Sequence, residues 1–242
     1  MIGRRKPPPP VSLWVPVGAP ELWALAAAGW ATWPQLSADD LVVEAYLLRA
    51  DAVRVVREDL ARREGEGSLV VFDVPADVAS WRDVRAVEDR LLIPKGRRLT
   101  KVIVGEILEE AQYQRGAAPD QLDVVQLAFG EPVPAAWRAM VTAPSWFRRG
   151  WMTTGAYVEL HPPVEAVRCT RQWWGDLVFH PGALVIGRDG RGRTLAVDLR
   201  EHDPPVLALD DLSTGWDDGV VQAAGVAELA ERLEVGDFGY LP

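Results

Sequence analysis

The feature that most constrains the fold of this chain is a predicted β-hairpin over residues 183–199. Two apolar runs flank the segment Asp189-Gly190-Arg191-Gly192. Asp-Gly between β-forming residues is typical of a hairpin turn, because such turns need positive φ angles that glycine adopts without steric cost. Apolar side chains alternate along 194–199, which predicts a strand with one buried face. Since no helix follows the glycines directly, a turn is favoured over a phosphate-binding loop.

The order of the other patterns predicts an α+β protein with two small domains. Basic residues and then four prolines open the chain, so residues 1–12 are predicted to be a disordered arm. A first α+β domain is expected over 13–116. A boundary follows, where apolar periodicity is lost around Gly116 and Pro119, and a second domain covers 121–242.

The second domain is predicted to be an antiparallel meander sheet flanked by helices. Helical patterns stand at 121–128 and 134–142, and an amphipathic helix at 223–234 closes the chain. Strands are expected at 156–161, 164–169, 183–188, 194–199 and 206–209. The first domain is expected to hold strands at 13–17, 68–74 and 101–108, with helices at 21–28 and from Asp51 to the glycines near 65.

Cysteine, histidine and hydropathy patterns limit the possible chemistry. The single cysteine, Cys169, excludes an intramolecular disulfide framework and a cysteine-based structural zinc site. The three histidines lack a helical pair spacing, so neither a metal nor another cofactor is expected. The basic start is not followed by an apolar stretch, and no unbroken apolar run reaches the ~18 residues of a membrane span. A cytoplasmic protein without a membrane partner is therefore expected.

Charge is distributed unevenly along the chain. The net charge is −9, and residues 121–242 hold 17 acidic but only 10 basic residues. The segment 201–218 has six acids and no lysine or arginine. Nucleic-acid binding requires the opposite sign, so a basic protein is the favoured partner. The acids predicted to bind it are Glu201, Asp203, Asp210, Asp211, Asp217 and Asp218.

Three tryptophans are candidate contacts for the same partner. Trp216 lies within the acidic segment, and aromatic side chains surrounded by charge are typical of protein interfaces. Trp173 and Trp174 lie in a predicted loop, where packing beneath the loop and exposed contact both remain open. A calcium loop is a further alternative for the acids, although they lack the regular alternation of the common calcium-binding loop.

Four segments of the second half together form a recognisable sequence pattern. They are Val133-Pro-Ala-Ala-Trp137, the strand pair 184–198, Val206-Leu-Ala-Leu209 and the helix 224–233. Together they resemble the SUKH superfamily of bacterial toxin-immunity proteins, which also includes fungal cell-wall regulators. The resemblance covers roughly residues 121–236. It implies a binding protein without enzymatic activity that neutralises a toxin.

A second, fainter resemblance concerns the first half. Leu13 to Gly18, Leu25 to Trp30, Arg90 to Pro94 and Ile103 to Ile107 are similar to a bacterial ADP-ribosylation-like domain. This resemblance implies a transferase that uses a nicotinamide dinucleotide and a glutamate, for which Glu88 and Glu106 are candidates. The alternatives are thus a binding protein, an enzyme carrying a SUKH-like recognition module, and a structural subunit of a larger assembly.

Overall fold

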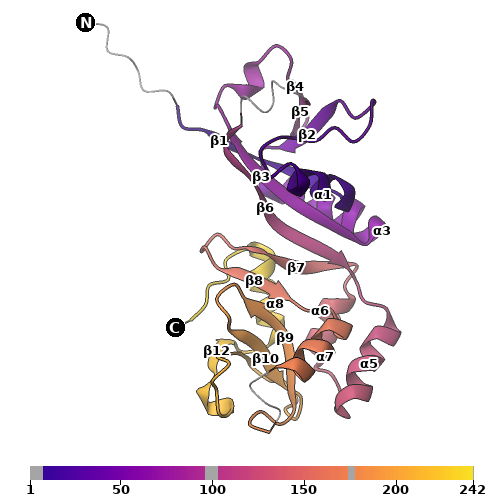
Figure 1. Cartoon of the computed structure of the whole chain (residues 1–242), viewed down its shortest axis with the longest axis vertical. Helices are drawn as coiled ribbons and strands as arrows, with labels where there is room; N and C mark the ends of the chain where they lie inside the picture. Colours follow the sequence, from indigo (N-terminus) through magenta and orange to yellow (C-terminus); the bar gives the residue numbers. More distant parts are fainter. Residues whose placement is uncertain (1–7, 96–102, 174–177, 242) are drawn as a thin grey trace, which may run out of the picture. The chain divides into compact units, whose positions relative to one another are not determined.

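The fold was analysed in a computed structural model that describes residues 8–95, 103–173 and 178–241 (Figure 1). Helices and strands are mixed, which confirms the α+β class. Twelve strands form an open antiparallel sheet in the order β12-β11-β10-β9-β8-β7-β6-β3-β1-β2-β5-β4. By its internal contacts the chain divides into a first unit, residues 1–112, and a second unit, residues 113–242. Strand β6 continues from one to the other.

The first unit has its core between strands and two helical segments. Strand β1 pairs antiparallel with β3, so that Val15 lies opposite Val70 and both are buried. Proline at the start of α1 suits the first helical turn. The elements are β1 (Val11–Val17), α1 (Ala19–Ala27), β2 (Val42–Tyr46), α2 (Arg49–Val55), a π-helical segment (Val56–Ala61), α3 (Arg62–Glu64), β3 (Glu66–Val74), a 3-10 turn (Val78–Ser80), β4 (Arg85–Val87), β5 (Arg90–Pro94) and β6 (Val104–Arg115).

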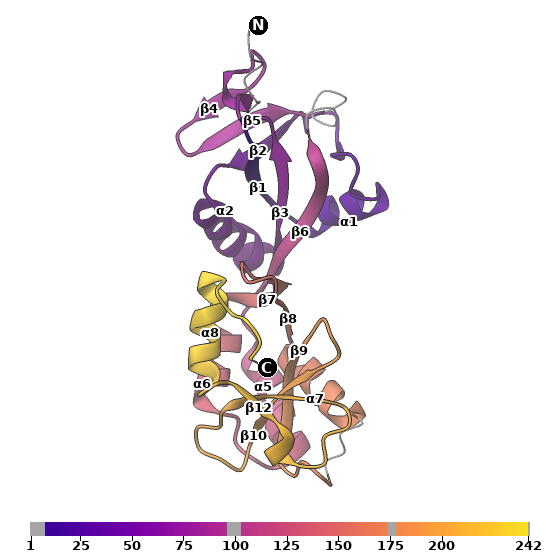
Figure 2. The same ribbon diagram turned by 90° about the vertical axis from the view of Figure 1, so that its left-hand side faces the viewer.

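The second unit places helices against an antiparallel meander (Figure 2). Helix α5 packs against α7, α6 packs against α8, and α7 packs on β9. The elements that follow β6 are α5 (Pro119–Phe129), α6 (Ala135–Thr142), β7 (Ser145–Trp151), β8 (Tyr157–Leu160), α7 (Pro163–Gln172), β9 (Ala183–Asp189), β10 (Thr194–Asp198), β11 (Val206–Leu209), a 3-10 turn (Trp216–Asp218), β12 (Val220–Ala223) and α8 (Val226–Val235).

Several sequence-based boundaries are wrong. The predicted strand 164–169 is part of helix α7, because Pro163 fixes a helical φ in the first turn and Ala166, Val167 and Thr170 then share the buried face. The segment expected to hold the domain boundary is strand as far as Arg115 and helix from Pro119. Strands β4, β7 and β12 were not predicted, since they are short or lack alternation.

The predicted arm 1–12 also ends too late. Val11 and Ser12 belong to β1, and the hydroxyl of Ser12 donates a hydrogen bond to Asp73 on β3 at 2.7 Å. Residues 8–10 have no regular structure, and residues 1–7 lie outside the described part of the chain.

The hairpin is formed by β9 and β10, with two differences from the prediction. The positive φ angle, 94°, belongs to Gly192 rather than Gly190. All five residues of β10 are buried, so the expected exposed face does not exist. The reason is that side chains cover both sides of the strand, and Ala196 packs with Leu207, Leu209, Trp173 and Trp216.

Within the described residues, no helix has both the length and the apolar character needed to cross a membrane.

Close backbone packing at Gly187 generates a first prediction. A Cβ atom there would lie 2.4 Å from the carbonyl oxygen of Glu159, so Gly187→Ala should separate β8 from β9 and destabilise the protein by about 1–3 kcal/mol. Gly215→Ala is the matched control, because Gly215 is extended (φ 177°) and a Cβ there meets no atom within 4 Å. Urea unfolding of both variants measures the difference, and equal midpoints would contradict the packing argument.

Candidate functional site

The acidic segment occupies two loops on either side of β11. Glu201 and Asp203 lie in the loop that enters β11, and the other four acids lie in the loop that follows it. All six are exposed. Since the two loops leave β11 at opposite ends, the acids do not form one continuous row along the chain. The second loop returns toward the first, because Trp216 packs against Leu207.

Trp216 is held in place by its neighbours. Its Nε1 donates a hydrogen bond to the carbonyl oxygen of Pro181 at 3.3 Å. Its ring lies edge-on to His180, with centroids 5.4 Å apart, and His180 in turn lies 4.8 Å from the ring of Trp173. Trp173 and Trp216 are therefore half-buried, each packed on one side, and contact with a partner stays a prediction for both. Trp174 lies outside the described residues.

A small pocket joins Trp216 to the first acidic loop. The pocket holds about 150 Å³. A carboxylate, an aromatic ring and apolar side chains thus meet at one surface depression. Its lining residues are Asp198, Arg200, Glu201, Pro205, Leu207 and Trp216.

Asp198 and Arg200 form an ion pair at the edge of this pocket, with Nη2 2.5 Å from Oδ2. Burial raises the pKa of the Asp198 carboxyl, but hydrogen bonds from the Arg200 side chain and backbone, together with its charge, lower it more. The net pKa of Asp198 lies below its ordinary value. The carboxylate is consequently charged at neutral pH and already has a cationic partner.

Two of the predicted binding acids stabilise their own loop. Asp210 Oδ1 accepts a hydrogen bond from the backbone of Leu212 at 3.0 Å. Asp218 Oδ2 accepts from the backbone nitrogen of Thr214 at 2.6 Å and from its hydroxyl at 3.0 Å. The backbone hydrogen bond is the largest effect that lowers the pKa of Asp218.

The other four predicted acids are free to meet a partner. Among the described residues, none forms a hydrogen bond or a salt bridge with the side chains of Glu201, Asp203, Asp211 or Asp217. Their negative charge is therefore compensated by solvent, apart from the weaker influence of Glu201 on Arg200.

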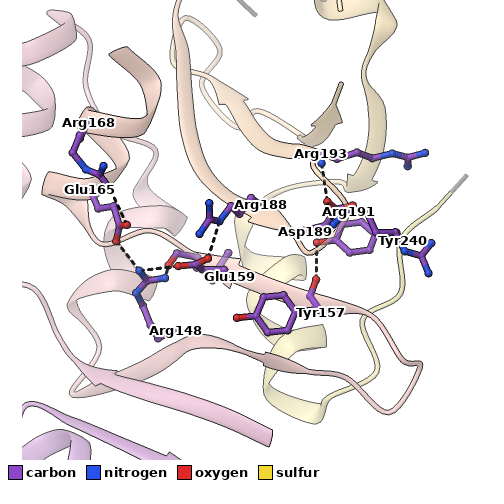
Figure 3. Close-up of polar contacts among 11 residues, drawn as sticks. Arg148, Tyr157, Glu159, Glu165, Arg168, Arg188, Asp189, Arg191, Arg193 and Tyr240 are labelled. Carbon is purple, nitrogen blue, oxygen red and sulfur yellow. Dashed lines mark hydrogen bonds and ion pairs between the residues drawn. The ribbon is translucent and has the colours of Figure 1, made fainter. Parts of the chain in front are cut away.

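The hairpin turn lines a second pocket, of about 440 Å³, that sequence reasoning missed. Its lining includes Asp189, Arg191 and the aromatic residues Trp151, Tyr157 and Tyr240. Figure 3 shows Tyr157 and Tyr240 near Asp189 and Arg191. Tyr240 donates a hydrogen bond to the carbonyl oxygen of Tyr157 at 3.2 Å, and burial raises the pKa of its hydroxyl. These aromatic residues come from separate elements, so their spacing along the chain gave no signal.

The two glutamates suggested for ADP-ribose transfer are not brought together in one pocket. Glu88 lies exposed in the turn between β4 and β5, with a φ of 53°. Glu106 is exposed on β6 and lines a pocket of about 520 Å³ with Trp30. Glu106 thus lies beside a cavity that could hold a ligand.

Comparison with protein-family models and with curated proteins found no match for this chain. The SUKH and ADP-ribosylation-like resemblances thus remain predictions.

The Asp198–Arg200 pair predicts how stability depends on pH. Because the folded-state pKa of Asp198 is depressed, its contribution is present above the unfolded-state pKa of about 3.9 and is lost as the pH falls through the folded-state value. Asp198→Asn should lower the free energy of unfolding at pH 7 and reduce the loss of stability below pH 4. Asp217→Asn should change neither. Urea unfolding from pH 7 to pH 2.5 tests this, and parallel curves for Asp198→Asn and the parent would contradict it.

Proposed function

We propose that this chain is a protein-binding protein without enzymatic activity whose acidic loops bind a basic polypeptide, in the manner of an immunity protein that neutralises a toxin. The observation that carries the proposal is the pocket where Glu201 and Trp216 meet, beside carboxylates that have no partner in the described chain. Asp203, Asp211 and Asp217 extend the negative surface. A partner that supplies lysine or arginine would satisfy these charges.

Recognition in this proposal has two physical components. The exposed carboxylates attract a cationic surface over distances of about 10 Å at ordinary salt, which speeds encounter and orients the partner. The pocket then offers the indole of Trp216 and the carboxylate of Glu201 to one cationic side chain. A guanidinium stacked on an indole contributes ~0.5–2 kcal/mol, depending on how much water is excluded.

Contacts within the loop that follows β11 hold the proposed binding surface in one conformation. Asp210 and Asp218 fix the backbone of the loop, and the indole of Trp216 is hydrogen-bonded and packed against His180. A surface that is already ordered loses less conformational entropy when a partner binds. Helices flank an antiparallel sheet in the second unit, although α7 replaces one of the expected strands, and the SUKH resemblance makes toxin neutralisation the proposed setting.

Charge reversal tests the proposal directly. The variant E201K/D211K/D217K should lose at least tenfold in affinity for basic partners, because three attractive charges become repulsive while the loop-forming Asp210 and Asp218 are kept. The matched control D39K/E58K/D77K makes the same change in net charge at exposed acids of the first unit.

The measurement uses two readouts. Fluorescence anisotropy with a labelled nona-arginine peptide reports direct binding and its salt dependence. The parent, the reversed variant and the control are then each used to capture proteins from a lysate of the native host. Proteins that the parent and the control retain, but the reversed variant does not, are the proposed partners. Equal binding by all three chains would disprove the role of the acidic loops.

One observation favours the enzymatic alternative strongly enough to be tested. Glu106 and Trp30 line a pocket of about 520 Å³ in the unit that resembles ADP-ribosylation-like domains. We expect no transfer of label when the protein is incubated with labelled nicotinamide adenine dinucleotide and host lysate. Transfer that is abolished by Glu106→Gln would overturn the proposal of a purely binding protein.

A further inference from the structure

His161, Glu165 and Cys169 are spaced four residues apart and meet in the second unit. A spacing of four places Glu165 and Cys169 on one face of α7, one turn apart. His161 directly follows β8 and precedes α7 by two residues. A ring nitrogen of His161, a carboxylate oxygen of Glu165 and the sulfur of Cys169 all lie within 4.8 Å of one another.

The side chain of His161 is buried, and one of its two ring nitrogens has no hydrogen-bond partner. His161 is 2% exposed, and no described residue forms a hydrogen bond with its Nδ1. A buried polar group left in this condition costs about 1–3 kcal/mol, so proteins usually supply a partner. Burial is the largest effect on the pKa of His161 and lowers it to about 4, although Glu165 and Glu159 act in the opposite direction. The ring is therefore neutral at pH 7, which is the form that binds metals.

We propose that His161, Glu165 and Cys169 bind a divalent transition-metal ion, and that zinc fits them best. Nitrogen, oxygen and thiolate sulfur are the donors that zinc takes in proteins. Bonds of about 2.0–2.3 Å in a tetrahedral arrangement separate ligand atoms by roughly 3.5 Å. The donors would thus need to approach one another by at most about 1.3 Å, a movement of the size that side-chain rotation can give. The fourth position would be left for water or for a group from a partner.

The charges around the cluster are compatible with a cation. Arg148 lies 2.6 Å from Glu165 and 3.3 Å from Glu159, and its side chain is 12% exposed (Figure 3). Arg168 and Arg188 contact the same two carboxylates, but their side chains are 59% and 62% exposed and therefore hydrated. The cluster thus lies among two carboxylates and three guanidinium groups, and solvent screens the two exposed guanidinium groups most.

Metal binding would be coupled to loss of the thiol proton. Burial, the largest effect, raises the pKa of the Cys169 thiol, so it is protonated when no cation is present. A divalent ion would displace that proton to solvent and form a metal–thiolate bond. This site is separate from the acidic loops and does not depend on the proposed function.

Because Cys169 is the only cysteine, its reactivity reports on this site alone. Chelator-treated full-length protein should bind one zinc ion per chain in titration calorimetry, with a Kd of about 1 µM or tighter. Zinc should slow alkylation of Cys169 by iodoacetamide at least tenfold, and excess chelator should restore the rate. An unchanged alkylation rate in saturating zinc would overturn the proposal, and this readout needs no variant to fold.

Variants identify the ligands. Cobalt should give a thiolate-to-metal charge-transfer band in the parent and in His202→Gln, a control at an exposed histidine outside the cluster. Cys169→Ser should abolish the band, and His161→Gln should weaken cobalt and zinc binding at least tenfold. Circular dichroism in chelator establishes that each variant is folded. A band that survives in Cys169→Ser, or equal zinc affinity in folded His161→Gln, would disprove the assignment.

Discussion

The carboxylate of Asp189 fixes the turn on which the second unit depends. Its Oδ1 accepts hydrogen bonds from the backbone nitrogens of Arg191 at 2.8 Å and Arg193 at 2.7 Å, and this closes the connection between β9 and β10 (Figure 3). The turn sets the register in which Thr194 lies opposite Arg188. A slip of one residue would move each β10 side chain to the other face of the sheet. A bulge between Leu195 and Ala196 then shifts the pairing, so the turn and the bulge together place Asp198 opposite Ala183.

The register links packing to the proposed binding surface. Ala196, Leu207 and Leu209 form an apolar surface on which Trp173 and Trp216 pack. Trp216 therefore brings the second acidic loop back toward Glu201, although β11 and its two flanking loops separate the two residues in the chain. Hydrophobic burial positions the loop, and the carboxylates that remain exposed give it charge. Different acids of this segment therefore have different roles. Asp210 and Asp218 stabilise the loop, whereas Asp211 and Asp217 are proposed to bind a partner.

The same sheet also explains why a buried histidine, a glutamate and a cysteine come together. Helix α7 packs on β9, and the pairing of β8 with β9 places Glu159 opposite Arg188 beside that helix. The short connection from β8 to α7 holds His161 at the helix N-terminal end. Paired charges surround the cluster and satisfy one another, whereas Nδ1 of His161 has no hydrogen-bond partner among the described residues.

The sequence by itself determined the α+β class, the hairpin, most helices and strands, and the acidic character of the segment after the hairpin. These features depend on local periodicity, on turn residues and on charge, which neighbouring residues reveal. It misassigned α7, because the short apolar run after Pro163 fits a strand or a helix and only packing on β9 selects between them. Tertiary structure alone decided that both faces of β10 are buried, that Trp216 meets Glu201, and that His161, Glu165 and Cys169 converge. Each of these features depends on contacts between segments that are distant in the chain. Such contacts produce no periodic pattern of residues, so the sequence alone does not predict them.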